Sequence, residues 1–467
     1  MSRDPGGVLL VSCYELGHQP LATALAAAFL RRAGFQPHQV DLAQSPLDPE
    51  AVRRAGVIAF SVPMHTALRI GVGAARQARA LNPGAAIGFF GLYAWLNREY
   101  LLDGLADWVV AGESEDALVD RVNGVPGPRG GAAPVLRRLD YPVPERTGLP
   151  GLDRYVMLEH RGNRVPAGYV EGSRGCLHRC RHCPIPPVYD GRFFAVPVET
   201  VMADVRAQIA AGARHITFGD PDFLNGPGHA RRLTAALHGE FPDVTFDFTA
   251  KVEHLLRHRA LLPELARANA IFAVSAVESL SDTVLAHLEK GHTRADILEV
   301  LDVTRAAGIA LRPTFVAFTP WTTLDDYVEL VEFVAEAGLT RHVDPIQLAI
   351  RLLVPPGSGL LDRPAIHPHL GPLDRARLGY SWTHPDPRMD RLCATVTGIV
   401  DRGTRDGHAP ERIVEMVRAA ARSAREGRPV PARPVTGRAD EVPRLTESWF
   451  CCAEPAPEQL VTLAPRT

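Results

Sequence analysis

The sequence predicts an α/β protein: a doubly wound parallel sheet, then a full or partial β/α barrel, then a mostly extended tail. Strand-like and helix-like segments alternate over residues 8–111 and again from about residue 169 to residue 361. A Gly/Pro-rich stretch, GVPGPRGGAA at 124–133, separates the two regions. Strands that alternate with helices are typical of parallel sheets, which bind their ligands at the carboxyl ends of the strands.

The first region contains the strands and helices of the doubly wound sheet. Short apolar runs predict strands at 8–13, 39–42, 57–62, 86–90 and 108–111. Residues 21–33 and 70–81 have a helical composition, and Gly34 ends the first of these helices. We expect this domain to span residues 1–123. A linker rich in proline and glycine follows at 124–164, because such a composition cannot hold a regular element.

The second region predicts a barrel over residues 165–361. Its first strand is expected at 169–170, followed by strands at 215–218, 244–249, 270–276, 310–317 and 345–353. Helical segments at 198–211, 229–240, 295–307 and 324–337 separate them. Lys251 and Glu253 follow the third strand, and Gln347 and Arg351 lie four apart on one face of the sixth. We expect these four side chains to face a substrate.

The rest of the chain divides into a helical or lid region at 362–427 and a tail at 428–467. Residues 410–426 predict a helix, and the polar stretch at 380–390 suits either a cover over the barrel mouth or a surface loop. Four prolines between residues 429 and 443 predict an extended tail.

Composition excludes several classes of protein. The formal net charge is -2 at pH 7, so no basic surplus indicates nucleic acid or an anionic membrane as a partner. No apolar run is long enough for a transmembrane helix, and the first residues lack a signal-peptide cleavage site, so we expect a cytoplasmic protein. Of the 51 basic residues, Lys251 and Lys290 are the only lysines.

Three of the seven cysteines form a tight group in the segment EGSRGCLHRCRHCPIP. Cys176, Cys180 and Cys183 have the spacing Cys-x3-Cys-x2-Cys just after the first barrel strand. Three thiolates on one short loop hold three corners of an iron-sulfur cluster and leave the fourth iron open to a chelating ligand. The alternative is a zinc site completed by His178 or His182. A lone Cys-x2-Cys pair would favour zinc, but a triad that heads a β/α region does not.

The triad in this position resembles that of the radical S-adenosylmethionine superfamily. The resemblance implies a partial (β/α)6 barrel and a [4Fe-4S] cluster whose open iron binds the amino and carboxylate groups of S-adenosylmethionine. One electron then cleaves the sulfonium, usually to a 5'-deoxyadenosyl radical.

Further residues are assigned to S-adenosylmethionine by the same resemblance. HITFGDPDFLNGP occupies the place of the methionine-binding segment, where Gly219, Asp220 and Asp222 are expected to contribute. Glu278, in AVSAVESLSD, stands where many relatives bind the ribose, and Ser275 is expected to orient the ligand beside it. LRPTFVAFTPWTT places Arg312 and Thr314 where the superfamily has adenine and carboxylate contacts. For the 219–222 segment the alternative is a turn with a solvated carboxylate. For Glu278 the alternative is an ordinary acidic residue at the start of a helix.

The N-terminal domain resembles the cobalamin-binding domain of cobalamin-dependent radical S-adenosylmethionine enzymes. GESED at 112–116 and the connector YPVPERTGLP are similar to segments of that class. The lower-axial signature Asp-x-His-x-x-Gly is absent, although His18 lies in the loop after the first strand. Ser61, His65 and Gly91 would either line a corrin or cap helices, so a domain kept only for packing is an equal alternative.

The tail contains adjacent cysteines in RLTESWFCCAEP. A disulfide between Cys451 and Cys452 would strain the ring that it closes, whereas two thiolates in a barrel mouth form a soft site. Trp449 and Phe450 would anchor such an arm in an apolar pocket. The ending is similar to the radical S-adenosylmethionine proteins with a Cys-Cys-Ala-Glu-Pro tail (the CUAEP/CCAEP-tail family), some of which carry selenocysteine here. That resemblance implies a redox, hydrogen-donor or soft-ligand role; the alternative is a C-terminus whose cysteines have no role.

The sequence thus predicts an enzyme that cleaves S-adenosylmethionine and starts radical chemistry on a small substrate. Electrons would come from a reductase with flavodoxin or ferredoxin. Two other enzyme hypotheses are cobalamin-dependent methyl transfer and transfer of the aminocarboxypropyl group to a soft acceptor. A non-catalytic iron-sulfur or metal-binding protein is the remaining alternative. The segments at 219–222 and Glu278 count against it, because a metal store needs no nucleotide contacts.

Overall fold

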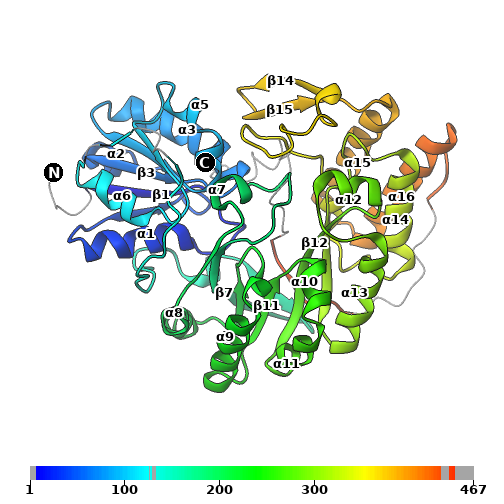
Figure 1. Ribbon diagram of the computed structural model, residues 1–467, viewed down its shortest axis with the longest axis horizontal. Coiled ribbons are helices and arrows are strands. Elements are labelled where there is room, and N and C mark those ends of the chain that lie inside the picture. Colours follow the sequence, from blue (N-terminus) through cyan, green and yellow to red (C-terminus); the bar gives the residue numbers. More distant parts are fainter. Residues whose placement is uncertain (1–6, 126, 129–132, 433–440, 448–467) are drawn as a thin grey trace.

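The computed structural model describes residues 7–125, 127–128, 133–432 and 441–447. An N-terminal domain lies beside a strongly curved sheet covered by helices, as Figure 1 shows. No helix in these described ranges is long and apolar enough to cross a membrane.

The N-terminal domain is a parallel sheet with helices on both faces. Its strand order is β2-β1-β3-β4-β5, with all neighbours parallel. Apart from the edge strand β2, the strands are almost continuous runs of buried apolar residues, as expected for strands covered on both faces. They are β1 (Val8–Ser12), β2 (His38–Asp41), β3 (Val57–Ser61), β4 (Ala86–Phe90) and β5 (Trp108–Val110). One face packs on α1 (Leu21–Arg32) and α6 (Glu115–Val122), and the other on α2 (Pro49–Arg54) and α3 (His65–Leu81). The short α4 (Leu92–Leu96) and α5 (Arg98–Leu102) follow β4.

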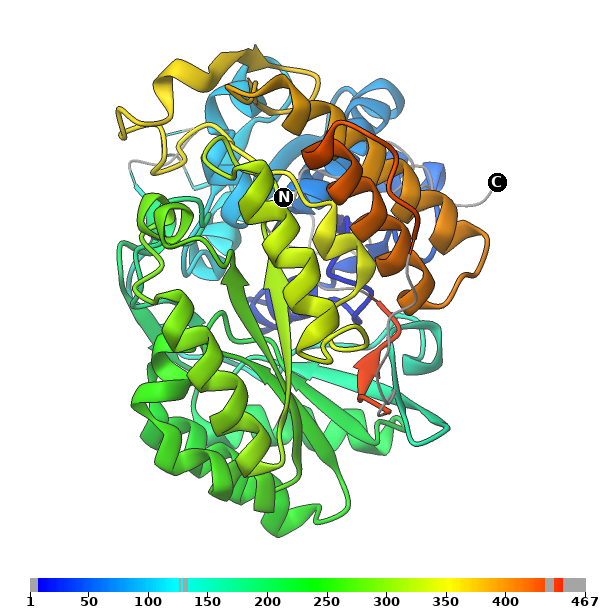
Figure 2. The same cartoon turned by 90° about the vertical axis from the view of Figure 1, so that its right-hand side faces the viewer.

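The second sheet has the order β13-β12-β11-β10-β7-β6-β16. Five neighbouring strands run parallel: β7 (Asn163–Val170), β10 (His215–Phe218), β11 (Thr245–Thr249), β12 (Ala270–Glu278) and β13 (Ala310–Phe315). Two antiparallel strands extend the edge, β6 (Met157–His160) and then β16 (Arg444–Leu445) from the far end of the chain. Figure 2 shows β16, in red, at this edge of the half-barrel.

Helices cover the convex face of the half-barrel. They are α8 (Val198–Ala210), α9 (Pro227–Glu240), α10 (Val252–Arg257), α11 (Leu262–Arg267), α12 (Asp282–Leu288), α13 (Arg294–Ala307) and α14 (Leu324–Glu336). Strand alternation separates the two faces of the sheet. On β11, Phe246 and Phe248 belong to the core under the helices, while Asp247 faces the concave side and accepts from Thr217.

Short elements form the connections. The strands β8 (Ser173–Gly175) and β9 (Phe193–Ala195) pair with each other on either side of α7 (Pro186–Tyr189). Single 3-10 turns complete the set: η1 (Leu152–Arg154), η2 (Phe223–Asn225), η3 (Arg259–Leu261), η4 (Pro345–Leu348) and η5 (His367–His369).

The sixth barrel strand expected at 345–353 is not formed, and this prediction was wrong. Residues 345–348 form the 3-10 turn η4, and a single bridge joins Phe318 to Arg351. Pro345 has no N–H to donate to a ladder, and the side chain of Gln347 accepts the N–H of Phe315 at 3.0 Å. Gln347 and Arg351 therefore do not share a strand face.

The region after the barrel has more structure than its composition indicated. The hairpin of β14 (Leu370–Asp374) and β15 (Gly379–Trp382) leads into α15 (Pro387–Arg405), whose N-terminus is capped by Asp386. The helix α16 (Pro410–Glu426), which the sequence predicted, packs against α15 and α14.

Candidate functional site

The cysteine triad lies on the loop between β8 and α7. Cys176 and Cys180 are buried, Cys183 is partly exposed, and none of the three forms a disulfide. Gly175, just before the loop, has φ +79°, and a Cβ there would lie 2.4 Å from the carbonyl oxygen of Arg192. Position 175 therefore requires glycine, because both the left-handed backbone and the close approach exclude a side chain.

The spread of the three sulfurs distinguishes a cluster from a single ion. Tetrahedral Zn–S bonds of about 2.3 Å place two sulfurs about 3.8 Å apart. The three cysteines do not form a group with all ligand atoms within 4.8 Å, although the structure describes all of them. The thiol set thus fits a larger metal body such as an iron-sulfur cluster better than one zinc ion.

A buried ion pair lies next to Cys180 and Cys183. Lys290 Nζ lies 3.2 Å from Glu278 Oε1, and His182 Nε2 lies 3.1 Å from the same oxygen. Although burial opposes ionisation, Lys290 and His182 lower the pKa of Glu278 to about 2. Burial also opposes the charge of Lys290, but Glu278 and the two cysteines raise the pKa of the ammonium above its usual range. The loop thus has a fixed positive charge beside two of its sulfurs.

A buried amide supports the Cys176 side. Asn225 Oδ1 accepts the N–H of Leu177 at 3.2 Å and lies 3.8 Å from Cys176 Sγ. The Nδ2 atom of Asn225 is buried without a partner in the described structure. Burial, followed by the charge of Asp222, raises the pKa of the Cys176 thiol to about 11. Cysteine binds metals as the thiolate, so metal binding here would release this proton.

Asp222 fixes the segment after β10 to the cysteine loop. Its Oδ2 lies 3.0 Å from His254 Nδ1 and 3.5 Å from His178 Nε2, and it accepts the N–H of Lys251 at 3.2 Å. Its Oδ1 accepts the N–H of Leu224. Although burial opposes ionisation, the two histidines hold the pKa of Asp222 below its usual range. Lys251 Nζ lies 3.1 Å from His178 Nδ1. The side chains of His178, Asp222 and His254 are therefore all paired within the protein.

The other two residues predicted in this segment hold the ends of the barrel strands in place. Asp220 accepts from Ser173 Oγ at 2.6 Å and from the N–H of Gly172 at 2.8 Å. A Cβ at Gly219 would lie 2.0 Å from the ring of Tyr169. Both residues lie beside the strand that leads into the cysteine loop, so the structure brings the 219–222 segment, Glu278 and the triad together.

Ser275 and Arg312 lie apart from this group. Alternation along β12 places Ser275 on the face of Ala273 and Val277, which belong to the core under the helices. Arg312 pairs with Asp344 at 2.9 Å and donates to the carbonyl of Pro443. The predicted tail residues Cys451 and Cys452 lie outside the described residues.

A cavity of about 220 Å³ lies between the N-terminal domain and the barrel. Gly175 and Pro184, which flank the cysteine triad, line it together with residues of the N-terminal domain. Several buried polar atoms in its wall have no partner in the described structure: Glu15 Oε1, His18 Nδ1, Ser61 Oγ and Glu115 Oε2. Gly91 also lines the cavity, whereas His65 bonds the carbonyl of Arg377 elsewhere.

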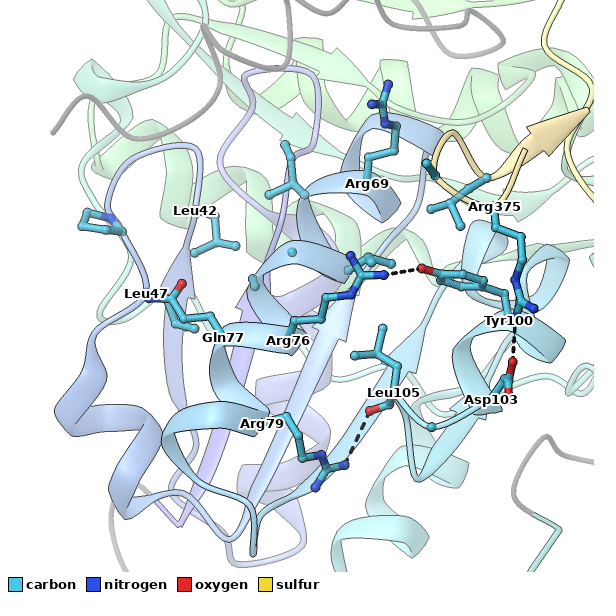
Figure 3. Close-up of a pocket in the computed structure, with 18 residues that line it drawn as sticks. Leu42, Leu47, Arg69, Arg76, Gln77, Arg79, Tyr100, Asp103, Leu105 and Arg375 are labelled. Atoms are coloured by element: carbon cyan, nitrogen blue, oxygen red, sulfur yellow. Dashed lines mark hydrogen bonds and ion pairs between the residues drawn. The ribbon is translucent and has the colours of Figure 1, made fainter. Parts of the chain in front are cut away.

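A larger cavity of about 1020 Å³ opens on the outer side of α3, next to the β14–β15 hairpin (Figure 3). Its polar side chains pair with one another: Arg76 donates to Tyr100, and Arg375 donates to Asp103. None of the described residues that line it belongs to the predicted site. The smaller cavity, by contrast, adjoins the predicted site through Gly175, Pro184 and Pro221.

Sequence reasoning missed Lys290 and Asn225 as parts of the site, and it considered His182 only as an alternative zinc ligand. The signal for Lys290 was its rarity, because it is one of two lysines among 51 basic residues. Both lysines are buried and both lie at the cysteine loop.

Comparison with known proteins agrees with this geometry. Residues 170–334 match the model of the Radical SAM superfamily, so the chain carries a radical SAM domain. A [4Fe-4S] cluster and S-adenosylmethionine, the cofactors predicted from the sequence, follow from that domain and are confirmed.

Curated relatives match over part of their length. A putative methylthiotransferase of Methanocaldococcus jannaschii is 24% identical over 196 residues, which cover 39% of this chain and 42% of the relative. The ribosomal protein uS12 methylthiotransferase of Porphyromonas gingivalis is 30% identical over 193 residues, 37% of this chain and 42% of the relative. The chain thus spans about two fifths of the length of these relatives.

Two solved structures share the fold. The cobalamin-dependent S-adenosylmethionine radical enzyme OxsB, with aqua-cobalamin bound, matches with a TM-score of 0.66 at 16% identity, over 86% of this chain and 68% of that chain. The radical S-adenosylmethionine methyltransferase TsrM from Kitasatospora setae, with cobalamin and a [4Fe-4S] cluster bound, matches with a TM-score of 0.55 at 17% identity, over 70% and 72%. The predicted fold, a doubly wound domain followed by a half-barrel, is confirmed.

Proposed function

We propose that this chain, which carries a radical SAM domain, reductively cleaves S-adenosylmethionine and starts radical chemistry on a small substrate between its two domains. The observation that supports this most is the position of the triad. The three cysteines lie on the loop between Gly175 and Pro184, two residues that line the inter-domain cavity, and their sulfurs do not all lie within 4.8 Å of one another.

In this proposal Cys176, Cys180 and Cys183 hold the [4Fe-4S] cluster, which supplies the electron that breaks the sulfonium bond. Lys290 keeps a positive charge beside Cys180 and Cys183, and it favours thiolates there. Asp222, through His178, and Asn225, through Leu177, fix the opposite side of the loop.

S-adenosylmethionine would bind next to the 219–222 segment and Glu278. Asp220 and Asp222 already accept several hydrogen bonds from the protein, so they position the segment, and the backbone around Gly219 is left for the methionine moiety. Glu278 has φ +68° at the end of β12, and the cysteine loop and Lys290 hold it in this strained conformation. Such strain at a site is typical of ligand contacts.

The second candidate is a cobalamin-dependent radical methyltransferase. The unpartnered polar atoms of Glu15, His18, Ser61 and Glu115 favour it, because a corrin carries amide side chains that would pair with them. These residues would hold the corrin against the carboxyl ends of the N-terminal strands.

The tail and the redox partner belong to the same proposal. Cys451 and Cys452 would act as a redox, hydrogen-donor or soft-ligand pair, in keeping with the Cys-Cys-Ala-Glu-Pro ending. Electrons would come from a flavodoxin or ferredoxin. None of the five described cysteines forms a disulfide, which suits a reducing cytoplasmic compartment.

The test is anaerobic product analysis. The reconstituted protein is incubated with S-adenosylmethionine and dithionite, and the nucleoside product is identified by mass spectrometry. We expect 5'-deoxyadenosine, lost in Cys176→Ala and retained in the control Cys393→Ala, whose thiol is buried in α15. Methylthioadenosine would indicate aminocarboxypropyl transfer, and S-adenosylhomocysteine would indicate methyl transfer. No product would favour the non-catalytic alternative.

Corrin binding separates the two candidates. Hydroxocobalamin is added to the purified protein, which is then desalted. Retained corrin absorbance that falls in His18→Leu and Ser61→Val would support the methyltransferase. If no corrin is retained, the methyltransferase is excluded and the cobalamin-independent enzyme is supported.

A further inference from the structure

Three side chains of the kind that bind metals converge beside the cysteine loop. His178 lies on that loop, Asp222 lies in the segment after β10, and His254 lies in α10. His178 Nε2 lies 3.4 Å from His254 Nδ1 and 3.5 Å from Asp222 Oδ2. His254 Nδ1 lies 3.0 Å from the same oxygen. The three atoms therefore form a triangle with nearly equal edges.

The size of this triangle matches the coordination shell of one small metal ion. Zinc bonds to histidine nitrogen and carboxylate oxygen are about 2.0–2.2 Å long, so tetrahedral ligand atoms lie about 3.3–3.5 Å apart. The measured edges run from 3.0 to 3.5 Å. Within the described part of the chain, this is the one group of three His, Cys, Asp or Glu side chains whose ligand atoms all lie within 4.8 Å of one another.

Hydrogen bonds account for only part of this arrangement. An N–H of His254 that donates to Asp222 explains the shortest edge, but the 3.5 Å between His178 and Asp222 is longer than the usual 2.7–3.2 Å of an N–H···O bond. His178 Nε2 lies just as close to the facing nitrogen of His254, and two ring nitrogens that both carry a proton do not attract each other. One shared ion would give all three atoms a common partner.

The neighbours of Asp222 hold its carboxylate in this orientation. Its Oδ1 accepts the N–H of Leu224 at 2.9 Å, and its Oδ2 accepts the N–H of Lys251 at 3.2 Å. Asp222 is fully buried and His254 is 3% exposed. An ion that binds here would therefore meet two of its ligands already in position, which lowers the entropic cost of binding.

Glu253 can accept the proton that metal binding would place on the outer side of the His178 ring. A ring that binds an ion through Nε2 carries its proton on Nδ1, and metal-bound histidines almost always donate that N–H to a carboxylate, a carbonyl or water. Glu253 Oε2 lies 3.7 Å from His178 Nδ1, and Lys251 Nζ lies 3.6 Å from the same oxygen. The Lys251 ammonium, which lies 3.1 Å from Nδ1, would then pair with Glu253.

We propose that His178, Asp222 and His254 bind one divalent transition-metal ion of the zinc type, separate from the cysteine triad. Two imidazoles and one carboxylate suit zinc, and three protein ligands leave a fourth position for water or a further ligand. The ion would join the cysteine loop to the segment after β10 and to α10. The site does not depend on the proposed function, because it uses neither the thiols nor S-adenosylmethionine.

The test is zinc binding by the whole chain after its iron-sulfur cluster has been reconstituted. The protein is incubated anaerobically with zinc sulfate and desalted, and its zinc and iron are measured by inductively coupled plasma mass spectrometry. We expect the wild type to retain about one zinc ion per chain more than His254→Ala or Asp222→Asn. Glu253→Gln, which changes a positioning residue, should weaken zinc binding about tenfold in a competition with a chelator.

His258→Ala is the matched control. The ring of His258 lies 5.6 Å from that of His254, and the residue follows the same helix without belonging to the triangle. This variant should retain the zinc. No zinc on the wild type, or equal zinc on the wild type and His254→Ala, would overturn the proposal. An equal loss in His258→Ala and His254→Ala would do the same.

X-ray absorption at the zinc edge keeps the proposal testable on the wild type where a variant does not fold. We expect nitrogen and oxygen ligands at about 2.0–2.1 Å, with the outer-shell scattering of imidazole. Sulfur ligands alone, at about 2.3 Å, would place the zinc on thiols and contradict the proposal. Both measurements are made without S-adenosylmethionine or reductant, so a failure of its cleavage leaves them unaffected.

Discussion

The ammonium of Lys290 lies 3.2 Å from the carboxylate of Glu278, and both side chains are buried at the cysteine loop. The pair joins the end of β12 to the turn after α12. The same ammonium acts on the thiols of Cys180 and Cys183. One buried ion pair therefore connects Glu278, the predicted ribose contact at the end of β12, with the thiols that are proposed to hold the cluster.

Removing one partner of this pair should destabilise the barrel. Lys290→Met leaves Glu278 buried with His182 as its remaining partner, and breaking a buried pair costs about 3–5 kcal/mol. We expect a lower urea midpoint for the apo protein. The double variant Lys290→Met with Glu278→Gln should lose less than the sum of the single losses. The exposed pair of Arg305 and Asp302 is the control, where Arg305→Met should cost at most about 1 kcal/mol.

Gly219→Ala should destabilise the fold through Tyr169. The new Cβ would lie 2.0 Å from the tyrosine ring, and overpacking of this kind costs about 1–3 kcal/mol. Adding Tyr169→Ala removes the clash, so the second change should cost less in the Gly219→Ala background than in the wild type. Gly239→Ala in α9 is the control, because nothing lies within 4 Å of its Cβ. Equal losses in thermal unfolding for Gly219→Ala and Gly239→Ala would contradict this account.

Arg312→Met should release residues 441–447 from the half-barrel. Arg312 donates to the carbonyl of Pro443 and pairs with Asp344, so its loss frees one anchor of the segment. We expect limited proteolysis by a glutamate-specific protease to cleave at Glu441 or Glu447 several-fold faster, with Arg305→Met unchanged. A loss of S-adenosylmethionine affinity with unchanged proteolysis would instead support the ligand contact that the sequence predicted.

Glu15 should make the protein less stable as the pH rises from about 5 to 7. Burial raises the pKa of Glu15 to about 7. Between its unfolded pKa and 7 the folded state therefore holds a proton that the unfolded state has lost, and stability falls with rising pH. Glu15→Gln should flatten this part of the profile by about 1–3 kcal/mol in chemical denaturation of the apo protein. An unchanged slope would show that Glu15 does not titrate in this range. The pKa of Glu278 is lowered instead, so its contribution to stability is lost only as the pH falls below about 4.5.

The parts of the fold that the sequence predicted are those with strong local signals. The buried strands β1 and β3 each contain a continuous apolar run, and the cysteine spacing is itself a short-range pattern. The segment 345–353 is also mostly apolar, but Pro345 has no N–H for a ladder, and the Gln347 side chain accepts the N–H of Phe315 instead. The helix α15 had a signal, since Met389, Leu392, Val396 and Val400 recur at helical spacing, but the prolines before it hid that pattern.

In the candidate site, too, some residues could be predicted from the sequence and others could not. The triad and Glu278 are close in the structure because the carboxyl ends of neighbouring strands meet at one edge. Ser275 could not be assigned to a face, because AVSAV is apolar on both sides and alternation gives no direction. The two-residue strand β16 is too short for any sequence pattern, and its partner β6 lies 285 residues away across the Arg444–Glu159 hydrogen bond.

The burial of both lysines has a practical consequence for labelling. Lys251 is 8% exposed and Lys290 is 2% exposed, and every other basic side chain of the Lys/Arg class is a guanidinium. An amine-reactive dye should therefore modify the α-amino group and little else in the folded protein. Incorporation of a second dye would report the opening of the cysteine loop, and a fluorophore attached this way would give a single-site reporter without any engineered residue.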